Sequence, residues 1–194
     1  MMSLVSLGTA AFLAGAVDLS RHRTLLDVGG GEAMNAIALA GRWPELHVTV
    51  LDLPTVAETT RARLTEQGMA ERVTAVGGDC FTEELPGEFD AVLFSRFLGI
   101  WSEEKIRGLL AKAARALRPG ASLYVIDALQ DDDEMGPPFV AHLSAYFLTL
   151  ASGEGMIRTW NEWTGWLEEA GFESFSRRPL PGGMSEFLIE AVKV

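Results

Sequence analysis

The sequence has little of what disulfide-bonded, zinc-binding or nucleic-acid-binding proteins need. It holds one cysteine, Cys80, and three histidines in 194 residues. It therefore has no internal disulfide and no Cys/His cluster at zinc-ligand spacing. Basic residues are also few, since 16 Lys and Arg stand against 27 Asp and Glu, a net charge of −11. A surface this acidic repels phosphate backbones and anionic headgroups, so we expect a small-molecule partner and neither nucleic acid nor a membrane.

Long apolar runs are missing as well. The longest candidate, at residues 1–17, is shorter than the roughly 20 residues that cross a bilayer and lacks the basic start of a signal peptide. We interpret it as an amphipathic or buried helix and expect a cytoplasmic protein. With 48% hydrophobic residues, disorder is excluded. The mean hydropathy of +0.16 is high for so charged a domain, and predicts apolar surface covered by a second copy in a homodimer or by a partner chain.

Short apolar strands alternate with helical stretches along the chain. We expect helices at 32–42, 54–67, 103–117, 139–150 and 160–170, and strands at 24–28, 47–51, 72–76, 89–94, 122–127, near 175 and at 186–192. This alternation is typical of a doubly wound α/β sheet, here mostly parallel with a C-terminal antiparallel hairpin. Ligands of such sheets bind outside the carboxyl ends of the strands, so the residues after each strand are the candidates for a site.

A glycine loop follows the first predicted strand, with Gly29, Gly30 and Gly31 next to Asp27 and Val28. Glycines allow a sharp turn and close approach of a ligand, although an ordinary strand-to-helix turn uses them too. The dinucleotide fingerprint needs a small residue at position 34, which is methionine here, and Asp27 would face the pyrophosphate. These features disfavour NAD.

Acidic residues also follow the second and third predicted strands. Asp52 lies 21 residues after Gly31, where it can accept hydrogen bonds from ribose hydroxyls or cap the helix that follows. Asp79 could receive the exocyclic amine of adenine, and Phe81 could line the ring. Three acids at three strand ends fit a cationic, adenosine-bearing ligand without phosphates. S-adenosylmethionine (SAM) is such a ligand.

These motifs resemble a known family. LLDVGGG, VLDLPTV, GGDCF and Trp101-Ser-Glu-Glu follow the order found in the SAM-binding domain of plant caffeate-type and bacterial secondary-metabolism O-methyltransferases, and GMIRTWNEWTGWLEEAGF matches the start and end of a family helix. The resemblance covers nearly the whole chain. It implies a Rossmann-like class I methyltransferase fold with seven strands, in which residues 1–20 are a connecting helix and residues 21–194 the SAM-binding domain. The family's N-terminal dimerisation domain has no match in the sequence.

The resemblance also implies roles for individual residues. Gly29 and Gly31 would face the methionine part of SAM, Asp52 the ribose, and Asp79 the adenine, with Trp101 packed beside it. Ala33 stands where the family usually has glycine. The expected cofactor-binding residues are Gly29, Gly30, Gly31, Asp52, Leu53, Gly78, Asp79, Cys80, Phe81, Ser95 and Trp101.

The resemblance breaks at the residues that move protons. The family places its catalytic His in Leu-His-Asp-Trp, whereas this chain has Gly99 and Ile100 in the middle of that motif. An acid ahead of the family's Arg-Thr pair is replaced by Ile157. Asp127, after the fifth strand, keeps an acid at the place of an orienting carboxylate. His142 lies in the helix that lines the family's acceptor pocket.

We therefore predict Asp127 and His142 as catalytic residues, and Tyr146 and Ile157 as lining the acceptor pocket. The predicted function is SAM-dependent methylation of a small aromatic or enolic acceptor in secondary metabolism, with S-adenosylhomocysteine (SAH) as product. O-methylation, C-methylation, SAM binding without methylation and a non-catalytic scaffold all remain open, and a nicotinamide-dependent oxidoreductase is the alternative from another class.

Other conspicuous residues have simpler interpretations. His22 and His47 precede strands at the end away from ligands, so we expect His22 at the surface and a structural role for His47. Trp160, Trp163 and Trp166 predict an amphipathic helix face packed on the sheet. The acidic run at 131–134 is expected to be solvated, and we predict no metal site.

Overall fold

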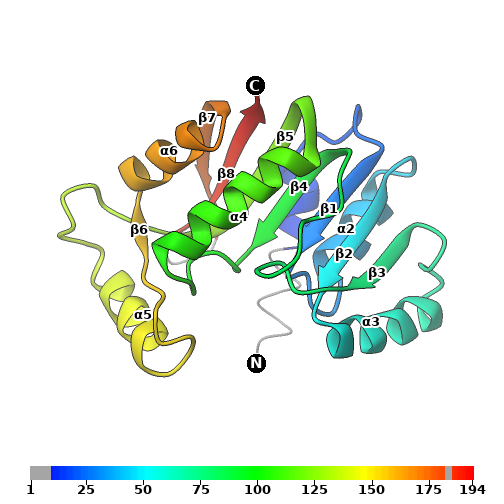
Figure 1. Cartoon of the computed structure of the whole chain (residues 1–194), viewed down its shortest axis with the longest axis horizontal. Helices are drawn as coiled ribbons and strands as arrows, with labels where there is room; N and C mark the ends of the chain where they lie inside the picture. Colours follow the sequence, from blue (N-terminus) through cyan, green and yellow to red (C-terminus); the bar gives the residue numbers. More distant parts are fainter. Residues whose placement is uncertain (1–9, 182–184) are drawn as a thin grey trace.

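A computed structural model describes residues 10–181 and 185–194, and it alternates strands and helices as predicted (Figure 1). A helix at residues 10–16 comes first, while residues 1–9 of the predicted connecting helix lie outside the described part. The elements that follow are β1 (Thr24–Val28), α2 (Met34–Arg42), β2 (His47–Asp52), α3 (Pro54–Glu66), β3 (Val73–Gly77), β4 (Phe89–Ser95), α4 (Glu103–Ala116), β5 (Leu117–Gln130), α5 (Pro138–Thr149), β6 (Arg158–Thr159), α6 (Trp160–Glu169), β7 (Phe172–Pro179) and β8 (Glu186–Lys193).

The strands form one sheet in the order β3-β2-β1-β4-β5-β8-β7, with β6 paired to β5 off this path. β1 to β5 are parallel, whereas β8 runs antiparallel to both β5 and β7. The predicted doubly wound sheet and C-terminal hairpin are confirmed. Strand order reverses between β1 and β4, where Val28 pairs with Leu51 on one side and with Phe94 on the other. The loops that follow these strands therefore meet at one edge.

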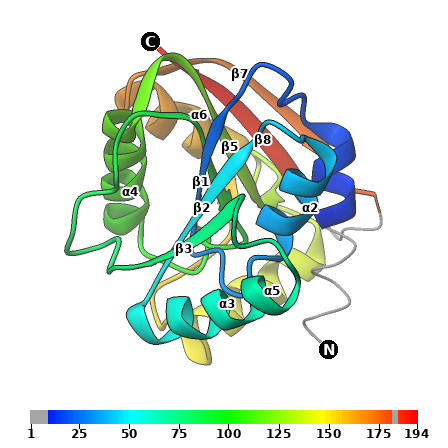
Figure 2. The same cartoon turned by 90° about the vertical axis from the view of Figure 1, so that its right-hand side faces the viewer.

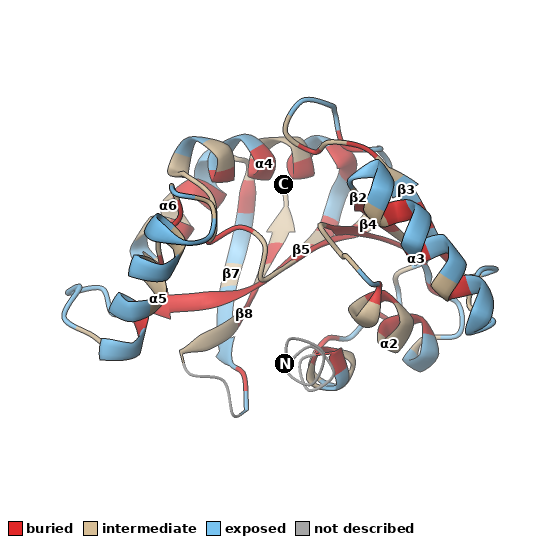
Figure 3. Cartoon of the chain, turned by 90° about the horizontal axis from the view of Figure 1, so that it is seen from below, coloured by how far each residue is buried: buried red, intermediate tan, exposed pale blue. Residues whose placement is uncertain are grey.

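Helices cover both faces of the sheet (Figures 2 and 3). α4 and α6 pack on one face around Phe94 and Trp163, while α2, α3 and the helix at 10–16 pack on the other around Leu93 and Leu39. α5 belongs to neither layer and lies beyond the strand ends, with Val140 as its one buried residue. No helix in residues 10–181 and 185–194 is long and apolar enough to cross a membrane.

Several boundaries differ from the prediction. α2 begins two residues late because Ala33, its N-cap, has a left-handed backbone with φ of 62°. β5 begins at Leu117, five residues early, since Leu117 pairs with Phe89 across an irregularity in β4. β6 has two residues and pairs with Leu129 and Gln130, so it is too short to leave a sequence pattern.

Two side-chain predictions have opposite outcomes. The tryptophan face of α6 is confirmed, since Trp163 and Trp166 are 1% and 6% exposed. His22 is half-buried and therefore less exposed than predicted: its Nε2 lies 3.2 Å from the Ser122 hydroxyl, and its ring meets Tyr124 edge-on. Burial lowers the pKa of His22, which favours the neutral ring. His47 is exposed at the start of β2.

α6 begins with a capping box. The Thr159 hydroxyl accepts the N–H of Glu162 at 3.2 Å, and the Glu162 carboxylate accepts the N–H of Thr159 at 2.7 Å. Thr159→Ala should lower the free energy of unfolding by about 1 kcal/mol because the first turn loses a hydrogen-bond acceptor. Denaturant titration measures this free energy. The control is Thr65→Ala, at an exposed site inside α3. A Thr159→Ala protein as stable as the wild type would contradict a role for the cap.

Candidate cofactor and acceptor site

The glycine loop after β1 is held open by its backbone conformation. Gly29 and Gly31 have φ values of 70° and 52°, which residues with a side chain rarely adopt. The Gly29 N–H donates to the Leu51 carbonyl at 2.8 Å. The Asp52 carboxylate accepts the N–H of Gly31 at 2.9 Å and that of Leu53 at 2.8 Å. Asp52 thus binds the loop to the end of β2, and each oxygen keeps acceptor capacity.

Asp27 lies directly behind this loop. It is fully buried, and neither carboxylate oxygen has a hydrogen-bond partner among the described residues. A Cβ at Gly30 would lie 2.7 Å from Asp27 Oδ2, so the carboxylate supports the loop from beneath. Burial, followed by the charge of Asp52, raises the pKa of Asp27 to about 7. An unpaired buried carboxylate is costly, and a nearby cation would offset that cost.

The turn after β3 presents Gly78, Asp79, Cys80 and Phe81. The Gly78 N–H donates to the Asp52 carbonyl at 2.9 Å, and Asp79 Oδ1 accepts the Phe81 N–H at 2.9 Å. That hydrogen bond holds the pKa of Asp79 below its usual value. Burial raises the pKa of the Cys80 thiol to about 11, so the thiol is unreactive near neutral pH.

Three aromatic rings lie beside this turn. Phe81 and Trp101 meet edge-to-face at 4.7 Å between ring centroids, and Phe97 lies 6.0 to 6.2 Å from both. Phe97 also packs on the glycine loop, because its ring occupies the space that a Cβ at Gly29 would need. Sequence reasoning missed Phe97. The apolar residues Phe97 and Leu98, directly after β4, were the available signal.

The segment from Ser95 to Trp101 joins β4 to α4 and carries the altered motif. Its centre is fixed by Asp127, whose Oδ2 accepts the Gly99 N–H at 2.7 Å. A Cβ at position 99 would lie 2.7 to 2.9 Å from the two Asp127 oxygens, so glycine is required beside this carboxylate. The same contact fills the position at which the resemblance places a catalytic histidine.

Asp127 is itself anchored. It is 5% exposed, and its Oδ1 accepts the Ala128 N–H at 2.9 Å. Burial raises the pKa of Asp127 to about 6, against the opposing effect of the N–H groups of Gly99 and Ala128. Arg96 and Glu186 form a bidentate ion pair nearby, at 2.5 and 2.8 Å, which sequence reasoning also missed.

The remaining predicted residues lie on or near α5. His142 and Tyr146, one helical turn apart, are both exposed, Tyr146 to 50%. His142 Nδ1 lies 2.9 Å from the Pro138 carbonyl. Ile157 is 1% exposed and packs with Ala128 and Val140. The structure thus gathers the predicted cofactor residues and Asp127 at the sheet edge, while His142 and Tyr146 lie on an open helix.

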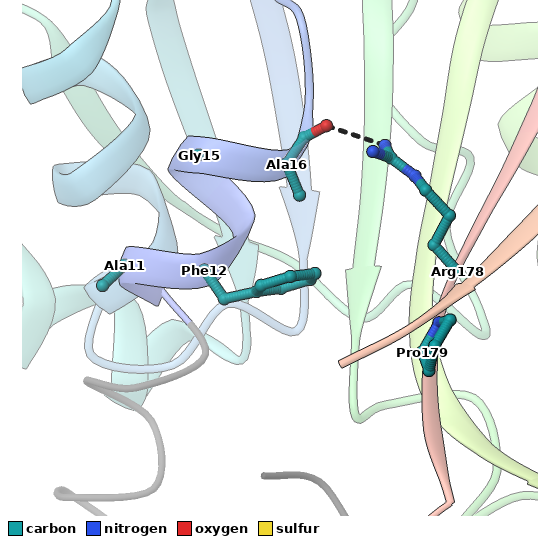
Figure 4. A pocket seen from close by; sticks show the side chains of 6 residues that line it. All are labelled: Ala11, Phe12, Gly15, Ala16, Arg178 and Pro179. Atoms are coloured by element: carbon teal, nitrogen blue, oxygen red, sulfur yellow. Dashed lines mark hydrogen bonds between the residues drawn. The ribbon is translucent and has the colours of Figure 1, made fainter. Parts of the chain in front are cut away.

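Two further features lie outside this arrangement. The acidic run at 131–134 is exposed, and the described residues hold no group of three potential metal ligands. A cavity of about 500 Å³ lies between the helix at 10–16 and the end of β7 (Figure 4). Arg178, which donates to the Ala16 carbonyl at 2.7 Å, lines it. The cavity is lined by none of the predicted site residues.

Residues 1–173 match the model of the O-methyltransferase domain. The chain belongs to the O-methyltransferase domain family. The L-tyrosine C(3)-methyltransferase of Streptomyces lavendulae is 37% identical over 179 residues, which are 91% of this chain and 49% of that protein. The 3-hydroxy-5-methyl-1-naphthoate 3-O-methyltransferase of Streptomyces sahachiroi is 39% identical over 163 residues, 84% of this chain and 47% of that protein.

A solved methyltransferase structure is also similar to this chain. The apo form of the S-adenosylmethionine-dependent methyltransferase SibL has a TM-score of 0.89 and 39% identity to this chain, covering 99% of it and 56% of the SibL chain. The class I methyltransferase fold expected from the motifs is therefore confirmed. The chain spans about half the length of the curated family members that it matches.

Gly99→Ala tests the contact with Asp127. The added Cβ would overlap a carboxylate that two backbone N–H groups hold in place, so the free energy of unfolding should fall by roughly 1–3 kcal/mol. The control is Gly108→Ala in α4, where a Cβ has nothing within 4 Å and alanine should stabilise the helix. A Gly99→Ala protein as stable as the wild type would show that the contact is not tight.

Asp27 predicts a pH dependence of stability. Its pKa is raised in the folded protein to about 7, so the folded state binds more protons than the unfolded state above pH 4, and stability falls as pH rises towards 7. Asp27→Asn removes this term. Relative to wild type, we expect the variant to gain roughly 2–3 kcal/mol between pH 5 and 8. Denaturant titrations at a series of pH values measure this difference, with the exposed Glu32→Gln as control. If the unfolding free energies of Asp27→Asn and wild type change with pH in parallel, the raised pKa of Asp27 is refuted.

Proposed function

We propose that this protein transfers the methyl group of SAM to a small aromatic or enolic acceptor, at oxygen or carbon, and releases SAH. The observation that carries the proposal is Asp27, a carboxylate that is buried behind a glycine loop and has no hydrogen-bond partner in the described part of the chain. A phosphate would be repelled there. Such a site calls for a cationic ligand. The activities for which the two similar Streptomyces enzymes are named, a C-methylation and an O-methylation, support both acceptor types.

The residues around the loop fit SAM chemically. Asp27 would stabilise the ammonium and sulfonium charges through its field, and the open backbone of Gly29 to Gly31 would admit the methionine part. Asp52 has lone pairs left for ribose hydroxyls, and Asp79 for the amine of adenine. Phe81 would line the adenine and Trp101 would pack beside it, with Gly30, Leu53, Gly78, Cys80 and Ser95 completing the wall. When bound, SAM supplies an electrophilic methyl group and its own leaving group.

The chain's own task is then to place the acceptor and remove its proton. Asp127 is the first proposed proton acceptor, because a carboxyl with pKa about 6 is ionised at neutral pH and each oxygen has accepted only one N–H. His142 is the second. Since Nδ1 donates to the Pro138 carbonyl, the neutral ring presents Nε2 as a base.

Gly99 favours acceptors that need little help with ionisation. With no side chain at that position, an enolic hydroxyl or a ring carbon activated by a phenolate suits the site better than an ordinary alcohol. Tyr146 and Ile157 are the proposed acceptor-side residues. Gly99 also favours a second candidate, a protein that binds SAM without methylating.

The proposal extends to partners. The segments on either side of α5 expose large apolar side chains, among them Met135 at 84% before it and Leu150 at 77% after it. A surface of this kind fits coverage by a second copy in a homodimer or by another chain. A cytoplasmic location is part of the same proposal, in keeping with the single free cysteine.

Calorimetric titration with SAM and SAH, with NAD as control, tests the proposal. Micromolar binding of SAM or SAH without binding of NAD is the expected result. Binding of NAD alone would replace the proposal with an oxidoreductase. Binding of neither by folded protein would refute a cofactor site on this chain.

Asp52→Ala tests the ribose assignment. Loss of the carboxylate should weaken SAH binding by about tenfold to a hundredfold, because ribose hydroxyls and the Gly31 N–H lose their acceptor. Glu58→Ala, exposed on α3, is the control, and thermal melting verifies folding. Unchanged affinity in folded Asp52→Ala would remove Asp52 from the site.

A further inference from the structure

Lys105 connects two parts of the molecule that the proposed function leaves separate. It lies in the first turn of α4, with its Nζ 4.8 Å from the ring centroid of Trp101 and 5.2 Å from that of Phe81. A cation at these distances is attracted to both ring faces. These are the two rings proposed to line the adenine, and the ammonium of Lys105 contacts both.

The same ammonium group forms an ion pair with Glu154, 49 residues along the chain. Glu154 belongs to the connection between α5 and β6, defined here as residues 150–157. The side chains of Lys105 and Glu154 are 40% and 30% exposed, so water screens the pair only in part. The ion pair joins the aromatic rings to the segment that follows α5.

Two more contacts hold this connection against the turn before α4. The Ser152 hydroxyl donates to the Ile100 carbonyl, and the backbone of Gly155 packs on that of Ile100 with no room for a Cβ. At its far end, the Ile157 N–H donates to the Ser144 hydroxyl of α5 at 3.0 Å. A continuous path of contacts therefore runs from the rings through residues 150–157 to α5.

We propose that Lys105 and Glu154 are positioning residues that couple cofactor binding to the acceptor-side segment, residues 150–157 and α5. The inference rests on the proposed function, since adenine must bind against the rings. Adenine bound against the rings restricts Phe81 and Trp101, the rings restrict the ammonium of Lys105, and the ion pair transmits that restriction to Glu154. Cofactor binding thus orders the segment that the acceptor meets.

Hydrogen exchange of the full chain, with and without saturating SAH, tests the coupling. In wild type, SAH should slow exchange of the amides at 150–157 at least about threefold. Lys105→Met should bind SAH about three to ten times more weakly and lose this slowing at saturation. Lys105→Arg should retain it, because a guanidinium can keep both the ion pair and the ring contact. Glu154→Gln, which leaves the rings untouched, should lose the slowing while binding SAH with nearly wild-type affinity.

Arg107→Met is the matched control, since Arg107 lies two residues further along α4 and pairs with Glu103 and Glu169 instead. It should behave as wild type. If SAH binds but leaves exchange at 150–157 unchanged, or if Lys105→Met and Glu154→Gln keep the slowing, the coupling is overturned while the proposed function stands. If calorimetry shows no SAH binding to wild type, the proposed function fails and this inference fails with it.

Discussion

Asp52 is the residue on which the cofactor half of the site depends. Its carboxylate accepts N–H groups from Gly31 and Leu53, and its carbonyl accepts the N–H of Gly78. One residue thus holds the loops that follow β1, β2 and β3. Parallel register brings these strand ends to one edge of the sheet, and Asp52 fixes the loops there relative to one another. The binding surface is preorganised by backbone hydrogen bonds to a single acid.

Asp27 and Asp127 show two ways to bury a carboxylate. Asp127 is compensated by two backbone N–H groups and serves to hold the segment before α4. Asp27 has no such partner within residues 10–181 and 185–194, and its position beneath the glycine loop suits the cationic ligand that we propose. The raised pKa of each group reflects burial, but only at Asp27 is the charge left for a ligand to balance. The burial of Asp27 lowers stability at a position that we propose to be functional.

The sequence predicted the features that follow local rules. Strand and helix periodicity gave the sheet, and the glycine loop and the acids at the strand ends were located by the rule that ligands bind at the carboxyl ends of parallel strands. Phe97, Lys105 and the Arg96–Glu186 pair were missed because their importance arises from contacts between distant segments. The left-handed backbone of Ala33 and the short β6 likewise have no local pattern. The burial of His22 depends on Ser122 and Tyr124, 100 and more residues away in sequence.

The pairing of Gly99 with Asp127 limits how the site can be redesigned. The two residues share one volume, so the side chain of a histidine at position 99 would have to displace the Asp127 carboxylate. Shortening Asp127 to make room would leave the N–H groups of Gly99 and Ala128 without an acceptor in the buried interior. Neither the substitution at position 99 nor the one at position 127 gives a well-packed variant by itself. A catalytic histidine cannot be grafted here one residue at a time, and an engineer would have to rebuild the segment before α4 together with the end of β5.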